Sequence, residues 1–100
     1  MKKSLYTIRK KKHAGHPQVI VDVNKTKFKS MSLTHGNKNK NTKRLIPLIK
    51  NPNVEDKEKA YLSKRIIEDF KFNFSKAFKN YKLTNADIEE IIKFLKSRQK

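Results

Sequence analysis

Three histidines are the side chains of this sequence best suited to acid–base chemistry. His13, His16 and His35 all lie in the first half of the chain, in segments typical of loops or strand ends. Because histidine titrates near neutral pH, such a residue can act as a general acid or a general base in the cleavage of RNA. Surface histidines without a chemical role are the alternative, and the spacing of the three does not support a metal site.

Positive charge is concentrated around these histidines. Residues 1–50 contain 14 Lys and Arg against one acid, Asp22, whereas residues 51–100 contain 12 against 8 acids, so the two halves carry +13 and +4. A field of this strength favours a phosphate backbone as the partner. The run from Arg9 to Lys12 is either a solvated, mobile loop or a grip for phosphates. The two interpretations are compatible because binding residues usually lie on loops.

Several classes of protein are excluded by what the sequence lacks. It has no cysteine for a disulfide or a thiolate metal site, and its two glycines do not form a Walker-type loop. No apolar run approaches the roughly 18 residues that span a bilayer. No apolar segment follows the basic N-terminus as it does in a signal peptide. We therefore expect a soluble, cytoplasmic protein with no membrane segment, no cofactor and no metal ion.

The hydrophobic pattern predicts four or five short strands that position the histidines. The clearest is Gln18–Val23, a nearly continuous β-branched run typical of a central strand buried on both faces. A turn at Asn24–Thr26 leads into its expected partner, Lys27–Leu33. Pro47 places the apolar run around it at a sheet edge or a bulge. Further runs are Leu5–Ile8 and residues 60–67, the latter a strand or a helical turn.

The end of the chain is predicted to be helical. Phe70, Phe72 and Phe74 alternate as in a strand, whereas Phe70, Phe74, Phe78 and Tyr81 fall at helical spacing, and we favour a short helix over Phe74–Tyr81. All of these aromatic residues are expected in the core rather than in a platform for base stacking. A second helix over Asn85–Ser97 is indicated by a capping box and an apolar stripe. The residues of that box and stripe are Thr84, Asp87, Ile88, Ile91, Ile92 and Leu95.

Strands followed by helices predict an α+β fold. We expect one domain over residues 1–100, with a basic, strand-rich part at 1–68 and a helical part at 69–100. Four to five strands in so short a stretch most naturally curl into a small β-barrel packed against one or two C-terminal helices.

Several short motifs resemble a family of ribonuclease toxins. His16–Val21 looks like the Arg-Pro-apolar strand of the MazF/PemK toxins. Phe28–Thr34 is similar to the strand that ends in Pro-Leu-Thr in those toxins and in the related ToxN/AbiQ toxins. Arg44–Leu48 resembles a later ToxN-like strand, and Lys82–Asp87 resembles the start of the closing MazF-like helix. The chain departs from the family in carrying His16 where the family has an arginine, and in being shorter than typical ToxN-like proteins.

This resemblance implies an SH3-like barrel that cleaves RNA without a metal ion. It places His16 at the position of the active-site arginine and Thr34 at that of the active-site threonine, with His35 beside it. Transfer of a proton by His16 or His35 and a hydrogen bond from Thr34 to the phosphate would then supply the chemistry. The residues expected to contact RNA are Arg9, Lys10, Lys11, Lys12, His13, Lys38, Lys40, Lys43 and Arg44.

The functional expectation is therefore a metal-independent endoribonuclease toxin of a toxin–antitoxin system, acting on single-stranded RNA. The resemblance implies an antitoxin as the natural partner, either an RNA or an acidic protein. The alternative is a basic nucleic-acid-binding protein without catalytic activity, ribosome-associated or phage-encoded, which uses the same positive surface.

Overall fold

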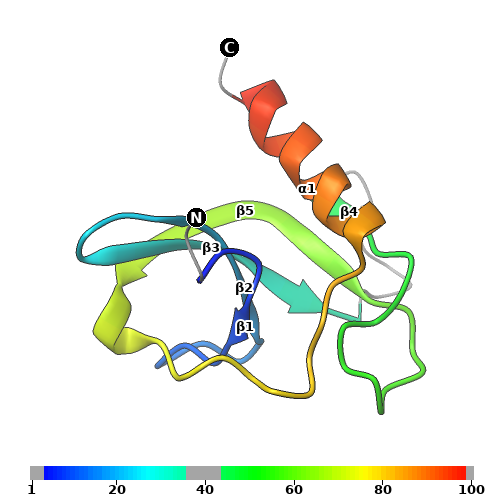
Figure 1. Cartoon of the computed structure of the whole chain (residues 1–100), viewed down its shortest axis with the longest axis horizontal. Helices are drawn as coiled ribbons and strands as arrows, with labels where there is room; N and C mark the ends of the chain where they lie inside the picture. Colours follow the sequence, from blue (N-terminus) through cyan, green and yellow to red (C-terminus); the bar gives the residue numbers. More distant parts are fainter. Residues whose placement is uncertain (1–3, 36–43, 99–100) are drawn as a thin grey trace.

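The computed structural model describes residues 4–35 and 44–98. The predicted RNA contacts Lys38, Lys40 and Lys43 lie outside the described residues. Within them, five strands precede a short 3₁₀ turn and one α-helix (Figure 1). In chain order these are β1 (Ile8–Arg9), β2 (Gln18–Val23), β3 (Lys27–Thr34), β4 (Leu45–Pro47), β5 (Tyr61–Phe70), η2 (Lys71–Asn73) and α1 (Asn85–Arg98).

The strands form a single antiparallel sheet in the order β1-β2-β3-β5-β4. The predicted hairpin joins β2 to β3, and the Asn24 side chain accepts hydrogen bonds from the backbone N–H groups of Thr26 at 3.0 Å and Lys27 at 2.7 Å. An Asn that bonds the backbone two and three residues ahead stabilises such a turn. The hairpin therefore brings the segment before β2 next to the segment after β3.

The predicted α+β class is confirmed, but closure of the sheet is not observed. Strands β1 and β4 are the two edges, and no hydrogen-bonded pair joins them within the described residues. As Pro47 predicted, β4 is an edge strand. Residues 60–67 were expected to form a strand or a helical turn, and residues 61–67 are in a strand, because β5 runs for ten residues between β3 and β4.

The predicted β2 is confirmed residue for residue, whereas the first strand is shorter than expected. Residues 4–6 form a turn in which Tyr6 has a φ of 63°, and β1 covers Ile8–Arg9 rather than Leu5–Ile8. A left-handed residue ends the extended backbone that a strand needs.

The predicted helix over Phe74–Tyr81 is wrong. This segment is irregular backbone that runs along the edge of the sheet, and its N–H groups bond distant carbonyls. Ser75 donates to Lys10 at 2.8 Å and Phe78 to Ile8 at 2.8 Å. These bonds satisfy the exposed edge of β1, so pairing with the sheet outweighs the helical spacing of the rings. Consequently, the helical part contains one α-helix, not two, within the described residues.

The terminal helix is confirmed within one residue at its end. The Thr84 hydroxyl accepts a hydrogen bond from the Asp87 N–H at 3.1 Å, which is half of the predicted capping box. The Asp87 carboxylate does not complete the box. It is buried and accepts hydrogen bonds from the backbone N–H groups of Ile49 at 2.9 and 3.1 Å and Lys50 at 3.4 Å. Asp87 therefore fastens α1 to the segment after β4.

The hydrophobic core lies between the sheet and α1. Ile91 is fully buried among residues of all five strands, while Ile88, Phe94 and Leu95 are half-buried against the same cluster. None of the helices in the described part of the chain has the length and apolar character needed to cross a membrane.

Candidate functional site

His16, Thr34 and His35 line one pocket of about 320 Å³. Because Gln18 pairs with Ser32 in the antiparallel hairpin, the residues just before β2 and just after β3 meet at the same end of the sheet. We call this the histidine pocket. Its complete lining is Gly15, His16, Pro17, Leu33, Thr34, His35, Asn51, Asn53, Asp56 and Tyr81.

A buried polar network fixes the loop that carries His16. The Gln18 side chain donates hydrogen bonds to the His16 carbonyl at 3.2 Å and to the Ser32 hydroxyl at 2.8 Å, and it accepts one from the Ser30 hydroxyl at 2.9 Å. Gln18 and Ser30 are buried, so these bonds are shielded from water. The polar residues Gln18, Ser30 and Ser32 on two paired strands indicate this network, but it was not predicted.

A backbone hydrogen bond joins the two chain segments that line the pocket. The Leu33 N–H donates to the Pro17 carbonyl at 2.8 Å, which ties the end of β3 to the segment before β2. Thr34 is half-buried at the end of β3, where it pairs with Tyr61 of β5. His16, which also lines the pocket, is exposed. The pocket therefore combines a threonine set in the sheet with two histidines that solvent can reach.

His35 lies between two carboxylates that sequence reasoning did not assign to it. Its Nε2 is 2.5 Å from the Asp56 Oδ2, and its Nδ1 is 3.8 Å from the Glu58 Oε2. The hydrogen bond with Asp56 raises the pKa of the His35 imidazole above its ordinary value of 6.5. The same bond lowers the pKa of the Asp56 carboxyl below 3.8. No local spacing links these residues, because the segment after β4 brings both acids to His35 from about 20 positions away.

The three groups are also close enough to share a cation. The ligand atoms of His35, Asp56 and Glu58 lie within 4.8 Å of one another. However, each carboxylate faces a different ring nitrogen. A protonated imidazole donates from both nitrogens, whereas a metal ion binds one of them, so this arrangement suits an imidazolium.

The His35 contact predicts a defined pH dependence. The raised pKa means that the contribution of His35 to stability is complete below about pH 6.5 and is lost as the pH rises through the folded value. The contribution of Asp56 is complete above about pH 3.8 and is lost as the pH falls through its lowered value. In an NMR titration we expect the His35 ring to titrate above pH 6.5 and Asp56→Asn to lower that midpoint. Glu55→Gln is the matched control, and a wild-type midpoint at or below 6.5 contradicts the contact.

The basic residues from Lys10 to His13 line a second pocket, of about 450 Å³, which we call the lysine pocket. Its lining is Lys10, Lys11, Lys12, His13, Ala14, Asn73, Phe74 and Ser75. The Lys12 N–H donates to the Asn73 carbonyl at 2.8 Å, and the Lys10 carbonyl accepts from Ser75. The run is therefore held by backbone hydrogen bonds rather than being a free loop. Residues 10–14 face this pocket and residues 15–17 face the histidine pocket, so one segment serves both.

The predicted RNA contacts differ in how available their charges are. The Arg9 guanidinium donates to Thr7 Oγ1 and to the Ser75 carbonyl, both at 3.1 Å, and burial lowers its pKa. The Lys11 ammonium lies 2.9 Å from a carboxylate oxygen of Asp69. Arg9 and Lys11 are thus held within the protein. The exposed candidates in the described part of the chain are Lys10, Lys12, His13 and Arg44.

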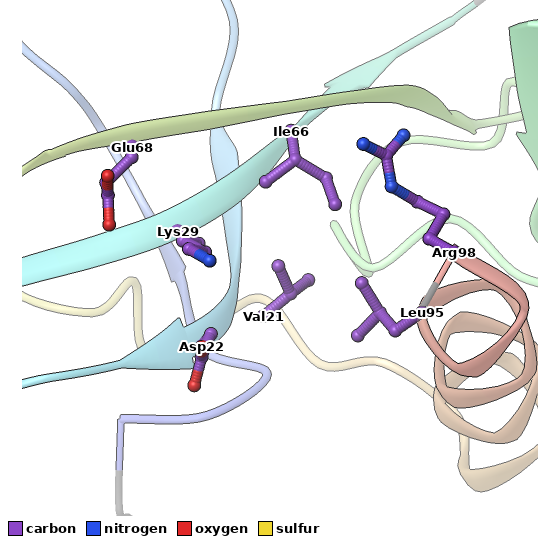
Figure 2. Close-up of a pocket in the computed structure, with 7 residues that line it drawn as sticks. All are labelled: Val21, Asp22, Lys29, Ile66, Glu68, Leu95 and Arg98. Atoms are coloured by element: carbon purple, nitrogen blue, oxygen red, sulfur yellow. The ribbon is translucent and has the colours of Figure 1, made fainter. Parts of the chain in front are cut away.

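A third concavity lies between the sheet and the C-terminal turns of α1. Figure 2 shows the side chains of Val21, Ile66 and Leu95 gathered around this space, with Lys29 and Arg98 at its rim. Its volume is about 520 Å³. None of the residues predicted to bind RNA or to act in catalysis lines it, so the candidate chemistry belongs to the histidine pocket.

Comparison of this chain with protein families, with curated proteins and with solved structures finds no match.

Proposed function

We propose that this protein is a metal-independent endoribonuclease toxin of a toxin–antitoxin system and that it cleaves single-stranded RNA in the histidine pocket. The observation that carries the proposal is the convergence of His16, Thr34 and His35 on one pocket from both ends of the β2–β3 hairpin. In this proposal the open, five-stranded sheet with its C-terminal helix is a variant of the SH3-like barrel.

The proposed reaction needs one base, one acid and stabilisation of a charged phosphate. The RNA 2′-oxygen attacks the adjacent phosphorus while His16 accepts the 2′-hydroxyl proton. The Thr34 hydroxyl donates a hydrogen bond to a non-bridging phosphate oxygen. As the bond from phosphorus to the 5′-oxygen breaks, His35 gives the proton on its Nδ1 to that oxygen, while its Nε2 keeps the hydrogen bond with Asp56. The products are a 2′,3′-cyclic phosphate and a free 5′-hydroxyl, and neither a cofactor nor a metal ion takes part.

The environment of His35 supports its role as the acid. Asp56 and Glu58 face its two ring nitrogens, and the hydrogen bond with Asp56 raises the pKa of the imidazole. A histidine with a raised pKa is protonated in a larger fraction of molecules at neutral pH and so has a proton to give. His16 has no carboxylate among its described ion pairs and is assigned the role of base.

A partner must hold such a nuclease inactive in the cell that makes it. The net charge of +17 favours an anionic antitoxin, either an RNA or an acidic protein.

A binding protein without catalytic activity, ribosome-associated or phage-encoded, is the second candidate. The observation that favours it is the separation of the lysine pocket from the histidine pocket. Phosphate binding by Lys10 and Lys12 needs none of the residues assigned to chemistry.

Incubation of the purified protein with RNA in EDTA distinguishes the two candidates. We expect RNA to be cut at defined positions even in EDTA, because the proposed acid and base are side chains and need no metal ion. RNA that stays intact while it is tightly retained by the protein overturns the nuclease and supports the second candidate.

A further inference from the structure

Two phenylalanine rings form an exposed parallel stack where β5 ends and η2 begins. The rings of Phe70 and Phe72 have centroids 5.3 Å apart and planes inclined by 9°. Phe70 is 42% exposed and Phe72 is 71% exposed. In Figure 1 this segment is the yellow-green stretch beside the β2–β3 hairpin. One face of the stack is therefore open for a flat, apolar group.

The backbone that carries the stack is fixed on both sides. The Lys71 N–H donates to the Thr26 carbonyl at 2.8 Å, and the Phe74 N–H closes η2 by donating to the Lys71 carbonyl at 3.0 Å. Just before the rings, Asp69 accepts bonds from Lys11, the Asn73 side chain and the Phe70 N–H, which together hold the pKa of its carboxyl at about 2. A ring on such a support loses little freedom when a ligand stacks on it.

Cations lie over Phe70 of the stack and over the neighbouring ring of Phe28. The Lys27 ammonium lies 5.0 Å from the centroid of Phe70. The Lys71 ammonium and the Arg9 guanidinium lie 5.6 and 5.1 Å from the centroid of the neighbouring, buried Phe28. The lysine pocket begins at Asn73, the residue after Phe72. The partner of this surface must therefore offer flat apolar faces and negative charges together.

Single-stranded nucleic acid has this chemistry. Its unpaired bases stack on aromatic side chains, and its phosphates follow basic grooves. In a duplex the bases are stacked on each other and the faces are unavailable. An acidic protein supplies the charge and single aromatic rings, but not the regular alternation of flat bases and phosphates along one strand.

We propose that Phe72, supported by Phe70, stacks on an unpaired base of single-stranded RNA whose neighbouring phosphates lie in the lysine pocket. The choice of RNA rests on the proposed function. The stack lies at the Lys27 end of β3 and the histidine pocket at the Thr34 end. At about 3.3 Å per residue these ends are about 23 Å apart, so the stacked base is several nucleotides from the bond that is cut.

A single tryptophan reports on this stacking. The chain contains no tryptophan, so Phe72→Trp introduces one fluorophore at the proposed site. We expect single-stranded RNA to quench its emission, whereas duplex RNA of the same length and inorganic polyphosphate leave it nearly unchanged. Ile49→Trp is the matched control, because Ile49 is also 71% exposed and lies outside both pockets that are assigned to RNA.

Equilibrium binding measures the contribution of the ring. Phe72→Ala should lower the affinity for single-stranded RNA by about 5- to 150-fold, the range expected for one stacked base. Phe72→Tyr should retain most of the affinity because it keeps the ring. Ile49→Ala should bind as the wild type does.

The outcomes separate this inference from the proposed nuclease. Equal affinity of Phe72→Ala and wild type, or equal quenching by polyphosphate, overturns the stacking and leaves a protein as the partner of the rings. Stronger ring-dependent binding of single-stranded DNA than of RNA overturns the choice of RNA. Ring-dependent RNA binding without any cleavage overturns the nuclease and keeps the stacking. RNA cleavage together with equal RNA affinity of Phe72→Ala and the wild type keeps the nuclease and overturns the stacking.

Discussion

Ile91→Asp is expected to unfold the protein, while Ile92→Asp on the next helical position has a small effect. Ile91 is 0% exposed and belongs to the core between α1 and the sheet. Ile92 is half-buried and lies outside that core cluster. An unpaired charge at a fully buried position costs about 4–5 kcal/mol or more. A domain of this size has a total stability of roughly 5–15 kcal/mol, so little of it would remain.

Circular dichroism and thermal melting measure this difference. We expect Ile91→Asp to lose its cooperative transition and Ile92→Asp to be destabilised by about 1 kcal/mol. Ile91→Ala, with an expected loss of about 2–5 kcal/mol, covers the case in which the aspartate variant yields no folded protein. An unchanged melting temperature for either Ile91 variant contradicts the docking of α1 on the sheet.

Substitutions in the histidine pocket should abolish cleavage while RNA still binds. His16→Ala and His35→Ala each remove a proposed acid or base, which typically lowers a rate by 10²–10⁴-fold. Thr34→Ala removes one donor to the phosphate, for a loss of about 10²–10³-fold. None of these side chains supplies much of the +17 charge, so RNA affinity should fall by less than about tenfold. Single-turnover cleavage and equilibrium binding on the same RNA measure the two quantities.

The reverse pattern is expected from the lysine pocket. Replacing Lys10 and Lys12 together by Gln should weaken binding about uniformly across sequences and lower the salt slope by about 2. Lys11 is left in place because it pairs with Asp69, so its loss would disturb the fold.

Full cleavage activity in His16→Ala and His35→Ala would move the active site away from the histidine pocket.

The elements with strong local signals were predictable from sequence. The strand Gln18–Val23 and its hairpin partner have β-branched or alternating residues on either side of an Asn turn, and both are observed. The last helix combines a capping threonine with an apolar stripe, and it begins at the predicted residue. In each case the local preference and the tertiary packing favour the same conformation.

The rest depends on contacts between distant segments. The rings of Phe74, Phe78 and Tyr81 suit a helix by spacing, but the unpaired edge of β1 takes their backbone as a hydrogen-bonding partner. Phe72, in η2 just before that segment, was expected in the core but is exposed. His35 acquires Asp56 and Glu58 through a loop whose path no local pattern predicts. His16, Thr34 and His35 could be named from the sequence, and they line one pocket, whereas the carboxylates beside His35 had no local signal.

Cleavage by the RNA 2′-hydroxyl, without a metal ion, is tested by one comparison in EDTA. Two strands of the same sequence are used, one entirely RNA and one with a single 2′-deoxynucleotide on the 5′ side of the cut. The proposed mechanism predicts that the first is cut to a 2′,3′-cyclic phosphate and a 5′-hydroxyl, and that the second stays intact at that position. Cutting of the deoxy-substituted strand at the same rate, or an intact RNA strand under these conditions, would contradict it.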